Sequence, residues 1–244
     1  MSSAVSVAHA AKGSIRGVAF DLDDTLVLTE PLKALSYARA AAEVAHGKLT
    51  EHEVVEGFKD LVGRPREAVA NALVERFKLP VTPEQLIERR LLVYEAMLEQ
   101  PDIIRTKMLP HAVQMVRWVK HEGLKTGLAT MSHRSQVDRI LAILGLSGQF
   151  DAITTVEEVR NGKPDPEIYR LLAKKLGVEP PHVLVIEDSP AGVQSALSAG
   201  MAVIAVPTAF SREAFATGDL LDRRWVVDDA SNLGSAIKRR IESP

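Results

Sequence analysis

Five short apolar runs, separated by longer amphipathic stretches, constrain the fold of this chain more than any other feature. The runs lie at residues 15–21, 124–130, 150–155, 183–187 and 202–206. Short apolar runs bounded by polar or turn residues are typical of buried strands. Helix-length stretches follow or separate the later runs, at 111–121, 134–144, 166–176 and 190–199. This alternation predicts βαβ units and an α/β fold built on a doubly wound, Rossmann-like parallel sheet.

Residues 30–107 interrupt the alternation, because their apolar residues recur at helical spacing and form no convincing strand. Two capping boxes, Thr50 with Glu53 and Thr82 with Gln85, indicate helix starts. We therefore expect a core domain of residues 1–28 and 108–244 and an inserted four-helix cap domain of residues 29–107. An insertion directly after the first strand lies at the carboxyl edge of the sheet, where open α/β folds bind ligands.

The first strand ends in two acidic residues, Asp21 and Asp23. A carboxylate at this edge can attack phosphorus and form an aspartyl-phosphate. A second carboxylate two residues later can protonate the leaving oxygen and then activate water. The alternative is an acidic turn that caps a helix.

Three further signals occur at or just beyond strand ends. Glu187 and Asp188 offer the hard oxygen ligands that suit Mg²⁺, although Ser189 and Pro190 also form a good helix start, and both interpretations can hold together. Lys163, just before a predicted helix, can hold a phosphate and pair with Asp21, or it is a solvated loop cation. Thr130 and Ser132 can donate to phosphoryl oxygens, or they are turn residues.

The chain carries an acid pair, a hydroxyl, a lysine and a second acid pair, in this order, and in this it resembles the haloacid dehalogenase (HAD) superfamily. Within that superfamily it resembles the subgroup with a helical cap, in the phosphatase and β-phosphoglucomutase-like branch. The stretches KPDPEIY at 163–169 and IEDSPAGVQSALSAG at 186–200 carry the resemblance most specifically. It implies Asp21 as nucleophile, Asp23 as general acid/base, and Thr130 and Lys163 as phosphate-binding catalytic residues. It also implies Mg²⁺ at Asp21, the Asp23 carbonyl and Asp188, with Glu187 beside them.

Substrate selection is expected to come from the cap. The segment around Gly63, Arg64 and Arg66 resembles the cap loop that reaches the substrate in this branch, and Arg66 matches an arginine that grips a distal phosphate in the mutases. Lys33 stands where the mutases carry a histidine, which weakens the mutase interpretation and allows an anion-binding role. These cationic residues could equally be solvated. We include Ser132, Gly63, Arg64, Arg66 and Lys33 as candidate substrate-binding residues.

Composition excludes several other classes. The chain has 30 Lys and Arg against 32 Asp and Glu, so bulk charge gives no reason to bind nucleic acid or an anionic membrane. It has no Cys, so thiol nucleophiles and Cys-based metal sites are excluded. We expect a cytoplasmic monomer or weak homodimer without a membrane span. Residues 1–12 read as a flexible leader, with a truncated transit peptide as the minor alternative.

The leading expectation is a Mg²⁺-dependent phosphatase of a small phosphorylated metabolite, most simply a sugar phosphate. The first alternative is a phosphomutase of the β-phosphoglucomutase type, which shares the core residues. The second is a non-catalytic protein that binds a phospho-ligand on the same scaffold. We assign no chemistry to the segment after residue 206, and we expect it to add a short strand at 225–227 and a helix near 231–241.

Overall fold

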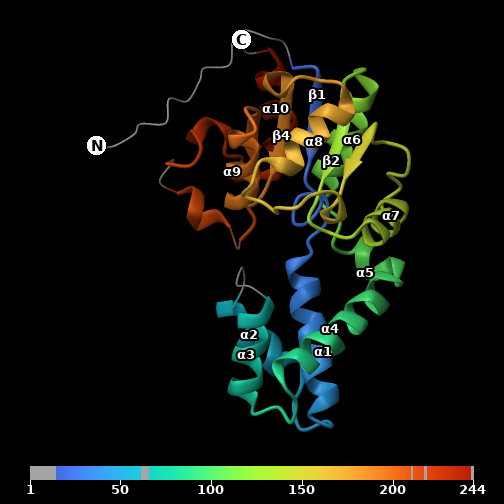
Figure 1. Ribbon diagram of the computed structural model, residues 1–244, viewed down its shortest axis with the longest axis vertical. Coiled ribbons are helices and arrows are strands. Elements are labelled where there is room, and N and C mark those ends of the chain that lie inside the picture. Colours follow the sequence, from blue (N-terminus) through green and yellow to red (C-terminus); the bar gives the residue numbers. More distant parts are fainter. Residues whose placement is uncertain (1–14, 62–65, 210, 217–218, 243–244) are drawn as a thin grey trace. The chain divides into compact units, whose positions relative to one another are not determined.

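A computed structural model describes residues 15–61, 66–209, 211–216 and 219–242 (Figure 1). Its contacts divide the chain into two compact units. The sheet unit holds the described residues up to 21 together with those of 111–131 and 148–244, and the helical unit holds those of 22–110 and 132–147. The division into a core of 1–28 and 108–244 and a cap of 29–107 stays a prediction.

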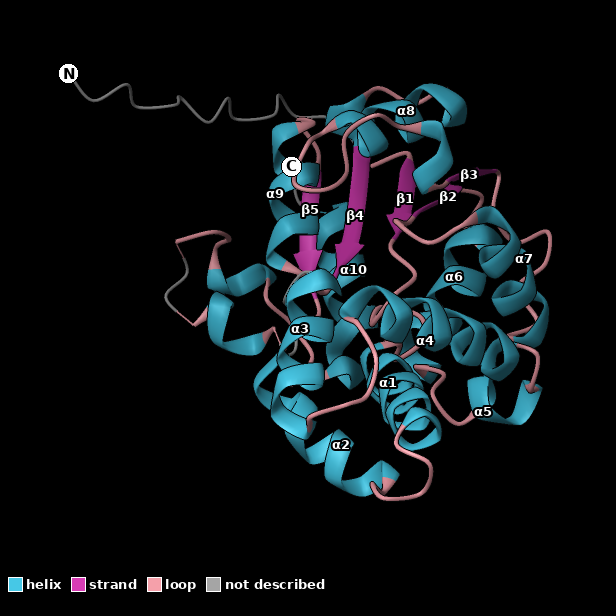
Figure 2. Ribbon diagram, turned by 60° about the horizontal axis from the view of Figure 1, so that its bottom comes forward, coloured by secondary structure: helices cyan, strands magenta, loops and turns pink. Residues whose placement is uncertain are grey.

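The sheet unit is built on five parallel strands, as the alternation predicted (Figure 2). They are β1 (Gly17–Phe20), β2 (Lys125–Ala129), β3 (Ala152–Thr154), β4 (Val183–Glu187) and β5 (Ala202–Ala205), in the order β3-β2-β1-β4-β5. Winding thus runs in both directions from β1, which is the doubly wound arrangement. Helices α6 (Pro110–His121), α8 (Glu167–Leu176), α9 (Pro190–Ser198) and α10 (Leu233–Glu242) flank the sheet.

Strand register brings the chemically interesting strand ends together. Phe20 of β1 is aligned with Leu128 of β2 and with Ile186 of β4. The pairing continues by one residue, because the Asp21 amide donates to the Ile186 carbonyl at 3.0 Å. The side chains that follow β1, β2 and β4 therefore begin at the same level of the carboxyl edge, at the point where the strand order reverses.

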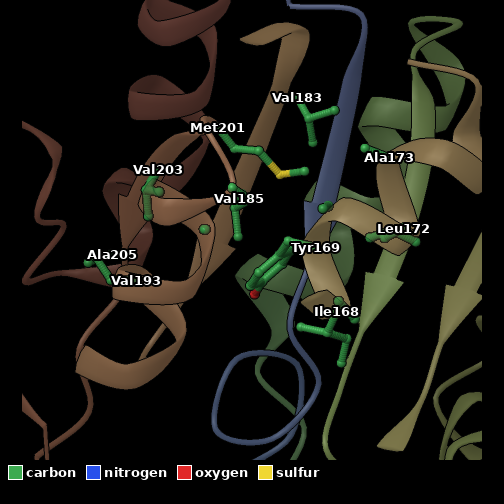
Figure 3. Packing of buried hydrophobic residues seen from close by; sticks show 14 of the residues in the cluster. Ile168, Tyr169, Leu172, Ala173, Val183, Val185, Val193, Met201, Val203 and Ala205 are labelled. Carbon is green, nitrogen blue, oxygen red and sulfur yellow. The ribbon is translucent and has the colours of Figure 1, made fainter. Parts of the chain in front are cut away.

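A continuous apolar core joins the sheet to α8 and α9 (Figure 3). Ile168, Tyr169 and Leu172 of α8 pack with Val185 and Val203 of the strands. Their spacing puts them on one helical face. Gly177 ends α8 with a φ of +66°, a left-handed conformation that glycine adopts without a Cβ penalty.

The strand expected at 225–227 is wrong in extent. The structure has a 3₁₀ turn, Arg223–Trp225, followed by a single parallel bridge between Val226 and Ala205. One further hydrogen bond runs from the Val227 amide to the Ala205 carbonyl at 2.8 Å. Because Trp225 belongs to the 3₁₀ turn, it is not available to extend the pairing with β5.

The helical unit contains α1 (Glu30–Val44), α2 (Glu51–Phe58), α3 (Arg66–Phe77), α4 (Pro83–Leu98), the short α5 (Pro101–Arg105) and α7 (Arg134–Ile143). Both predicted capping boxes are present, at the starts of α2 and α4. Four long helices lie between residues 30 and 98, as expected, and α5 is an additional single turn. Among the described residues, no helix has both the length and the apolarity needed to cross a membrane.

Candidate active site

Three buried carboxylates gather at the carboxyl edge of the sheet. Asp21 follows β1, Glu187 ends β4, and Asp188 comes next in the chain. One oxygen from each lies within 4.8 Å of the others, and all three residues are buried. Oxygen ligands at this spacing fit a hard divalent cation such as Mg²⁺, so the donor set is compatible with the predicted metal.

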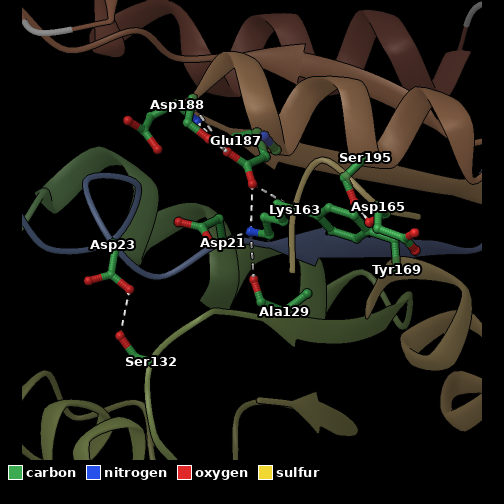
Figure 4. Close-up of polar contacts among 12 residues, drawn as sticks. Asp21, Asp23, Ala129, Ser132, Lys163, Asp165, Tyr169, Glu187, Asp188 and Ser195 are labelled. Atoms are coloured by element: carbon green, nitrogen blue, oxygen red, sulfur yellow. Dashed lines mark hydrogen bonds and ion pairs between the residues drawn. The ribbon is translucent and has the colours of Figure 1, made fainter. Parts of the chain in front are cut away.

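Lys163 reaches into the same cluster from the loop before α8 (Figure 4). Its Nζ donates to Asp21 Oδ1 at 2.6 Å, to Glu187 Oε1 at 2.6 Å and to the Ala129 carbonyl at 3.2 Å. Burial alone would lower the pKa of Lys163, but the Asp21 and Glu187 carboxylates outweigh it and raise that pKa well above its usual value. The ammonium is therefore charged, and it holds two carboxylates in fixed positions.

Both oxygens of Glu187 accept hydrogen bonds from the protein. Oε1 also accepts from the Tyr169 hydroxyl at 2.9 Å. Oε2 accepts from the amides of Asp188 and Ser189, each at 3.1 Å, and from the Ser189 hydroxyl at 3.0 Å. Ser189 is also the N-cap of α9, accepting from the Gly192 amide at 3.1 Å, so its capping role and its place in the site coexist.

Two residues of this cluster were not found from sequence. Tyr169 is fully buried, with the Lys163 ammonium 5.1 Å from its ring centroid. Gly192 lies so close to Glu187 that a Cβ atom there would overlap the carboxylate. Both residues fall within the two stretches quoted above that carry the family resemblance, but neither residue type suggests chemistry there, so only the folded chain indicates their roles.

Thr130 follows β2 and is fully buried, with its amide donating to the Thr154 carbonyl at 3.1 Å. This bond continues the β2–β3 pairing by one residue, so Thr130 lies at the carboxyl edge of the sheet unit, as predicted. In the helical unit, the Ser132 hydroxyl donates to Asp23 Oδ2 at 2.7 Å (Figure 4). The structure thus brings together two predicted residues that are 109 positions apart in the chain.

Lys33 also belongs to the helical unit. It forms an ion pair with Glu30 at 2.7 Å on α1. Burial opposes its charge, but Asp23 and Glu30 outweigh the burial and raise the pKa of Lys33. The side chain is therefore a charged residue surrounded by acids, and it differs in this respect from a freely solvated helix lysine.

A cavity of about 290 Å³ opens within the helical unit. Its lining combines charged, aromatic and aliphatic side chains: Glu30, Lys33, Arg66 and Arg90, then Tyr37 and Phe58, then Leu61 and Val69. Two predicted substrate-binding residues, Lys33 and Arg66, therefore line one cavity. Of the other three, Ser132 is bonded to Asp23 as described above, and Gly63 and Arg64 lie outside the described residues.

Known proteins resemble this chain in sequence and in fold. The family model of haloacid dehalogenase-like hydrolases matches residues 15–200. A phosphorylated carbohydrates phosphatase of Thermotoga maritima is 33% identical over 190 residues, covering 77% of this chain and 82% of the relative. The fructose-1-phosphate phosphatase of Escherichia coli is 28% identical, covering 78% of this chain and 95% of the relative.

A solved structure from Thermotoga maritima, which carries a provisional β-phosphoglucomutase assignment, superimposes with a TM-score of 0.74 at 26% identity. The match covers 92% of this chain and 99% of the other. The sheet order, the acid cluster with its buried lysine, and these similarities lead to one conclusion. The chain belongs to the haloacid dehalogenase-like hydrolase family.

Proposed function

We propose that this protein is a Mg²⁺-dependent phosphatase that hydrolyses a small phosphorylated metabolite of the sugar phosphate class through an aspartyl-phosphate. The observation that carries the proposal is the buried Lys163 ammonium, which bridges the carboxylates of Asp21 and Glu187 beside Asp188. Relatives named as phosphatases of phosphorylated carbohydrates and of fructose 1-phosphate support the substrate class.

In the first half-reaction, the Asp21 carboxylate attacks phosphorus and the bond from phosphorus to the ester oxygen breaks. Asp23, two residues later in the chain, gives its proton to the leaving alkoxide. In the second half-reaction, Asp23 takes a proton from water, the water oxygen attacks phosphorus, and inorganic phosphate leaves Asp21. The Ser132 hydroxyl, hydrogen-bonded to Asp23 Oδ2, would orient this acid.

Lys163 holds Asp21 in place through their hydrogen bond, and its charge compensates the incoming phosphate together with the Thr130 hydroxyl. Asp21 and Asp188 would hold Mg²⁺, whose charge stabilises the anionic transition state. Asp23 and Glu187 stay predicted members of the metal site. Because both Glu187 oxygens already accept protein hydrogen bonds, we propose that this residue acts mainly by fixing Lys163.

A phosphomutase of the β-phosphoglucomutase type is the second candidate. It is favoured by the Thermotoga maritima structure and by Arg66 on the lining of the helical-unit cavity. The two candidates differ in whether the phosphoryl group passes to water or to a sugar hydroxyl. Cytoplasmic location and a monomeric or weakly dimeric state stay predictions.

The test is to incubate the protein with Mg²⁺ and a panel of phosphorylated metabolites that includes fructose 1-phosphate and β-glucose 1-phosphate. Inorganic phosphate and isomerised sugar phosphate are measured in the same samples. Phosphate release supports the phosphatase, and isomer formation without phosphate release supports the mutase. A folded protein that is inert toward every ester would contradict both and favour a phospho-ligand-binding role.

The variant Asp21→Asn removes the nucleophile and is expected to lose essentially all turnover, with an unchanged circular dichroism spectrum. The matched control is Asp102→Asn, whose carboxylate is highly exposed on α5 and takes no part in the proposed site. Turnover of Asp21→Asn close to that of the control would exclude the aspartyl-phosphate mechanism.

A further inference from the structure

Helix α7 is joined to α4 by a small polar network within the helical unit. Glu95 lies on α4, and its Oε1 accepts a hydrogen bond from the side-chain amide of Gln136 on α7. Its Oε2 accepts from Arg139 Nη1 at 3.2 Å. Gln136 and Arg139 are three residues apart and therefore share one face of α7. One carboxylate thus holds two side chains that lie 41 and 44 positions later in the chain.

Gln136 extends this contact to the first turn of α7. Its Oε1 accepts from the amide of His133, the N-cap residue, at 3.4 Å. The first amides of a helix have no partner within the helix, so the Gln136 side chain satisfies one of them. Ser132 precedes His133, and its hydroxyl donates to Asp23 Oδ2 at 2.7 Å (Figure 4). A continuous series of contacts therefore runs from Glu95 through Gln136 and the backbone of 132–133 to Asp23.

Stability alone is a poor explanation of this network. The side chains of Glu95 and Arg139 are 43% and 34% exposed. Ion pairs with this exposure contribute little to the free energy of unfolding. The geometry has a second consequence, because a carboxylate that accepts from two points on one helix face fixes the rotation of that helix about its own axis. The rotation of α7 in turn sets the position of Ser132, which lies just before its first turn.

We propose that Glu95 is a positioning residue for the acid/base Asp23 and that it acts through Gln136 and Ser132. The proposal rests on the proposed phosphatase function, because it concerns the transfer of the Asp23 proton to the leaving oxygen. That proton moves as the bond from the oxygen to phosphorus breaks. A carboxyl group displaced from the leaving oxygen delivers the proton less well, and small displacements of a catalytic group cost a large part of the rate.

Leaving groups of different basicity make the test specific. Fructose 1-phosphate releases a strongly basic alkoxide, whereas 4-nitrophenyl phosphate releases a weakly basic phenolate that needs little protonation. The value of kcat/KM, measured with Mg²⁺, reports the steps up to transfer of the phosphoryl group to Asp21. We expect Glu95→Ala and Gln136→Ala each to lower kcat/KM about tenfold for fructose 1-phosphate, and less than about twofold for 4-nitrophenyl phosphate.

Three further variants identify the network as the cause. The double variant of Glu95→Ala and Gln136→Ala should lose no more activity than either single variant, because both changes interrupt the same series of contacts. Glu95→Gln keeps an acceptor for the Gln136 amide and should retain most of the parent activity. Asp138→Ala is the control, because it breaks an exposed ion pair with Arg134 on the same helix, at 2.9 Å, and should leave kcat/KM for both esters unchanged.

Amide hydrogen exchange tests the positioning of Ser132 without any substrate. It is measured by NMR on the full-length protein in a chelator. We expect the amides of residues 132–136 to exchange faster in Glu95→Ala than in the parent, because the first turn of α7 loses its attachment to α4. In Asp138→Ala the same amides should exchange at the parent rate.

Equal losses of kcat/KM for the two esters in Glu95→Ala would assign Glu95 a general structural role and would overturn the proposal. Additive losses in the double variant, or unchanged exchange at 132–136, would overturn it as well. If Glu95→Ala does not fold, Gln136→Ala decides in its place. If the parent hydrolyses neither ester, the proposed phosphatase function fails for these substrates, and the exchange rates alone decide whether Glu95 positions Ser132.

Discussion

Asp24 is a buried carboxyl group in a backbone conformation that most residues avoid. Its φ is +56°, in the left-handed region where Asp and Asn are tolerated better than other non-glycine residues. Oδ1 accepts from the amides of Thr29 and Glu30, at 2.8 and 3.2 Å, and so holds the start of α1. Burial raises the pKa of Asp24 to about 6, against the opposing effects of Lys33 and the Glu30 amide.

The raised pKa gives a sign for the pH dependence of stability. The folded protein binds this proton more tightly than the unfolded chain, whose Asp pKa is about 3.9. Stability contributed by the protonated carboxyl is therefore present at low pH and is lost as pH rises toward about 6. At neutral pH the charged form costs the fold about 1–3 kcal/mol, from roughly 1.4 kcal/mol per pKa unit.

Asp24→Asn keeps an oxygen acceptor and tolerates the left-handed backbone, but it carries no charge. We expect it to match the parent near pH 4 and to exceed its unfolding free energy by about 1–3 kcal/mol above pH 6. Urea denaturation across pH 4–8, in a chelator, measures the difference. An Asn variant less stable than the parent at pH 7 would mean that the two amide hydrogen bonds outweigh the cost of burying the charge.

At the scale of elements, the contact between α9 and β4 depends on the absence of one side chain. Gly192 is buried in the first turn of α9, where a Cβ atom would overlap the Glu187 carboxylate at the end of β4. Glu187 cannot move aside easily, because Lys163, Tyr169 and the turn that begins α9 all hold it. The same close contact between Gly192 and Glu187 therefore positions both the start of α9 and the acidic cluster.

Gly192→Ala is expected to reduce the unfolding free energy by about 1–3 kcal/mol, in the range of overpacked core substitutions, and to reduce turnover strongly. Helix propensity alone predicts the opposite, since Ala is the better helix former. Ala191→Gly, at the exposed neighbouring position, is the control and should cost only about 1 kcal/mol with turnover retained. A stable, active Gly192→Ala variant would show that Glu187 does not need its observed position.

The elements themselves could be predicted because their signals are local. Buried strands such as β1 and β4 are continuous apolar runs, and capping boxes such as Thr82 with Gln85 depend on neighbours three residues apart. The prediction of a strand at 225–227 failed because a 3₁₀ turn forms from some of the same residues, and the apolar character of a short segment does not distinguish the two structures.

From the sequence, only those site residues could be predicted whose side-chain type itself suggests catalysis or metal binding. Asp21, Lys163 and Asp188 have residue types that suggest catalysis or metal binding at strand ends. Tyr169 does not, because its role depends on a hydrogen bond to a residue 18 positions away. Arg90 in the helical unit is similar, because it becomes informative only once its burial and its lack of a described carboxylate partner are known.

At the scale of the whole molecule, the acid cluster couples metal binding to folding. Three carboxylates, Asp21, Glu187 and Asp188, lie together, and the Lys163 ammonium pairs with Asp21 and Glu187. The acids of this cluster therefore outnumber its lysine by two. Repulsion among them opposes folding when no cation is bound. A divalent cation that binds only the folded state stabilises it by mass action, by about 2.7 kcal/mol at 100 times its Kd.

We therefore expect Mg²⁺ to raise the melting temperature of the parent by about 5–10 °C at such saturation, from roughly 2–4 °C per kcal/mol for a chain of this size. Asp188→Asn should be at least as stable as the parent in a chelator, because it relieves repulsion, and should lose most of the Mg²⁺ increment. Glu179→Gln is the control, an exposed acid just before the opposite end of β4, and it should keep the full increment. Calorimetry with and without Mg²⁺ measures all three proteins. An Asp188→Asn variant with the full increment would place the metal elsewhere and would leave the buried acids to act through Lys163 alone.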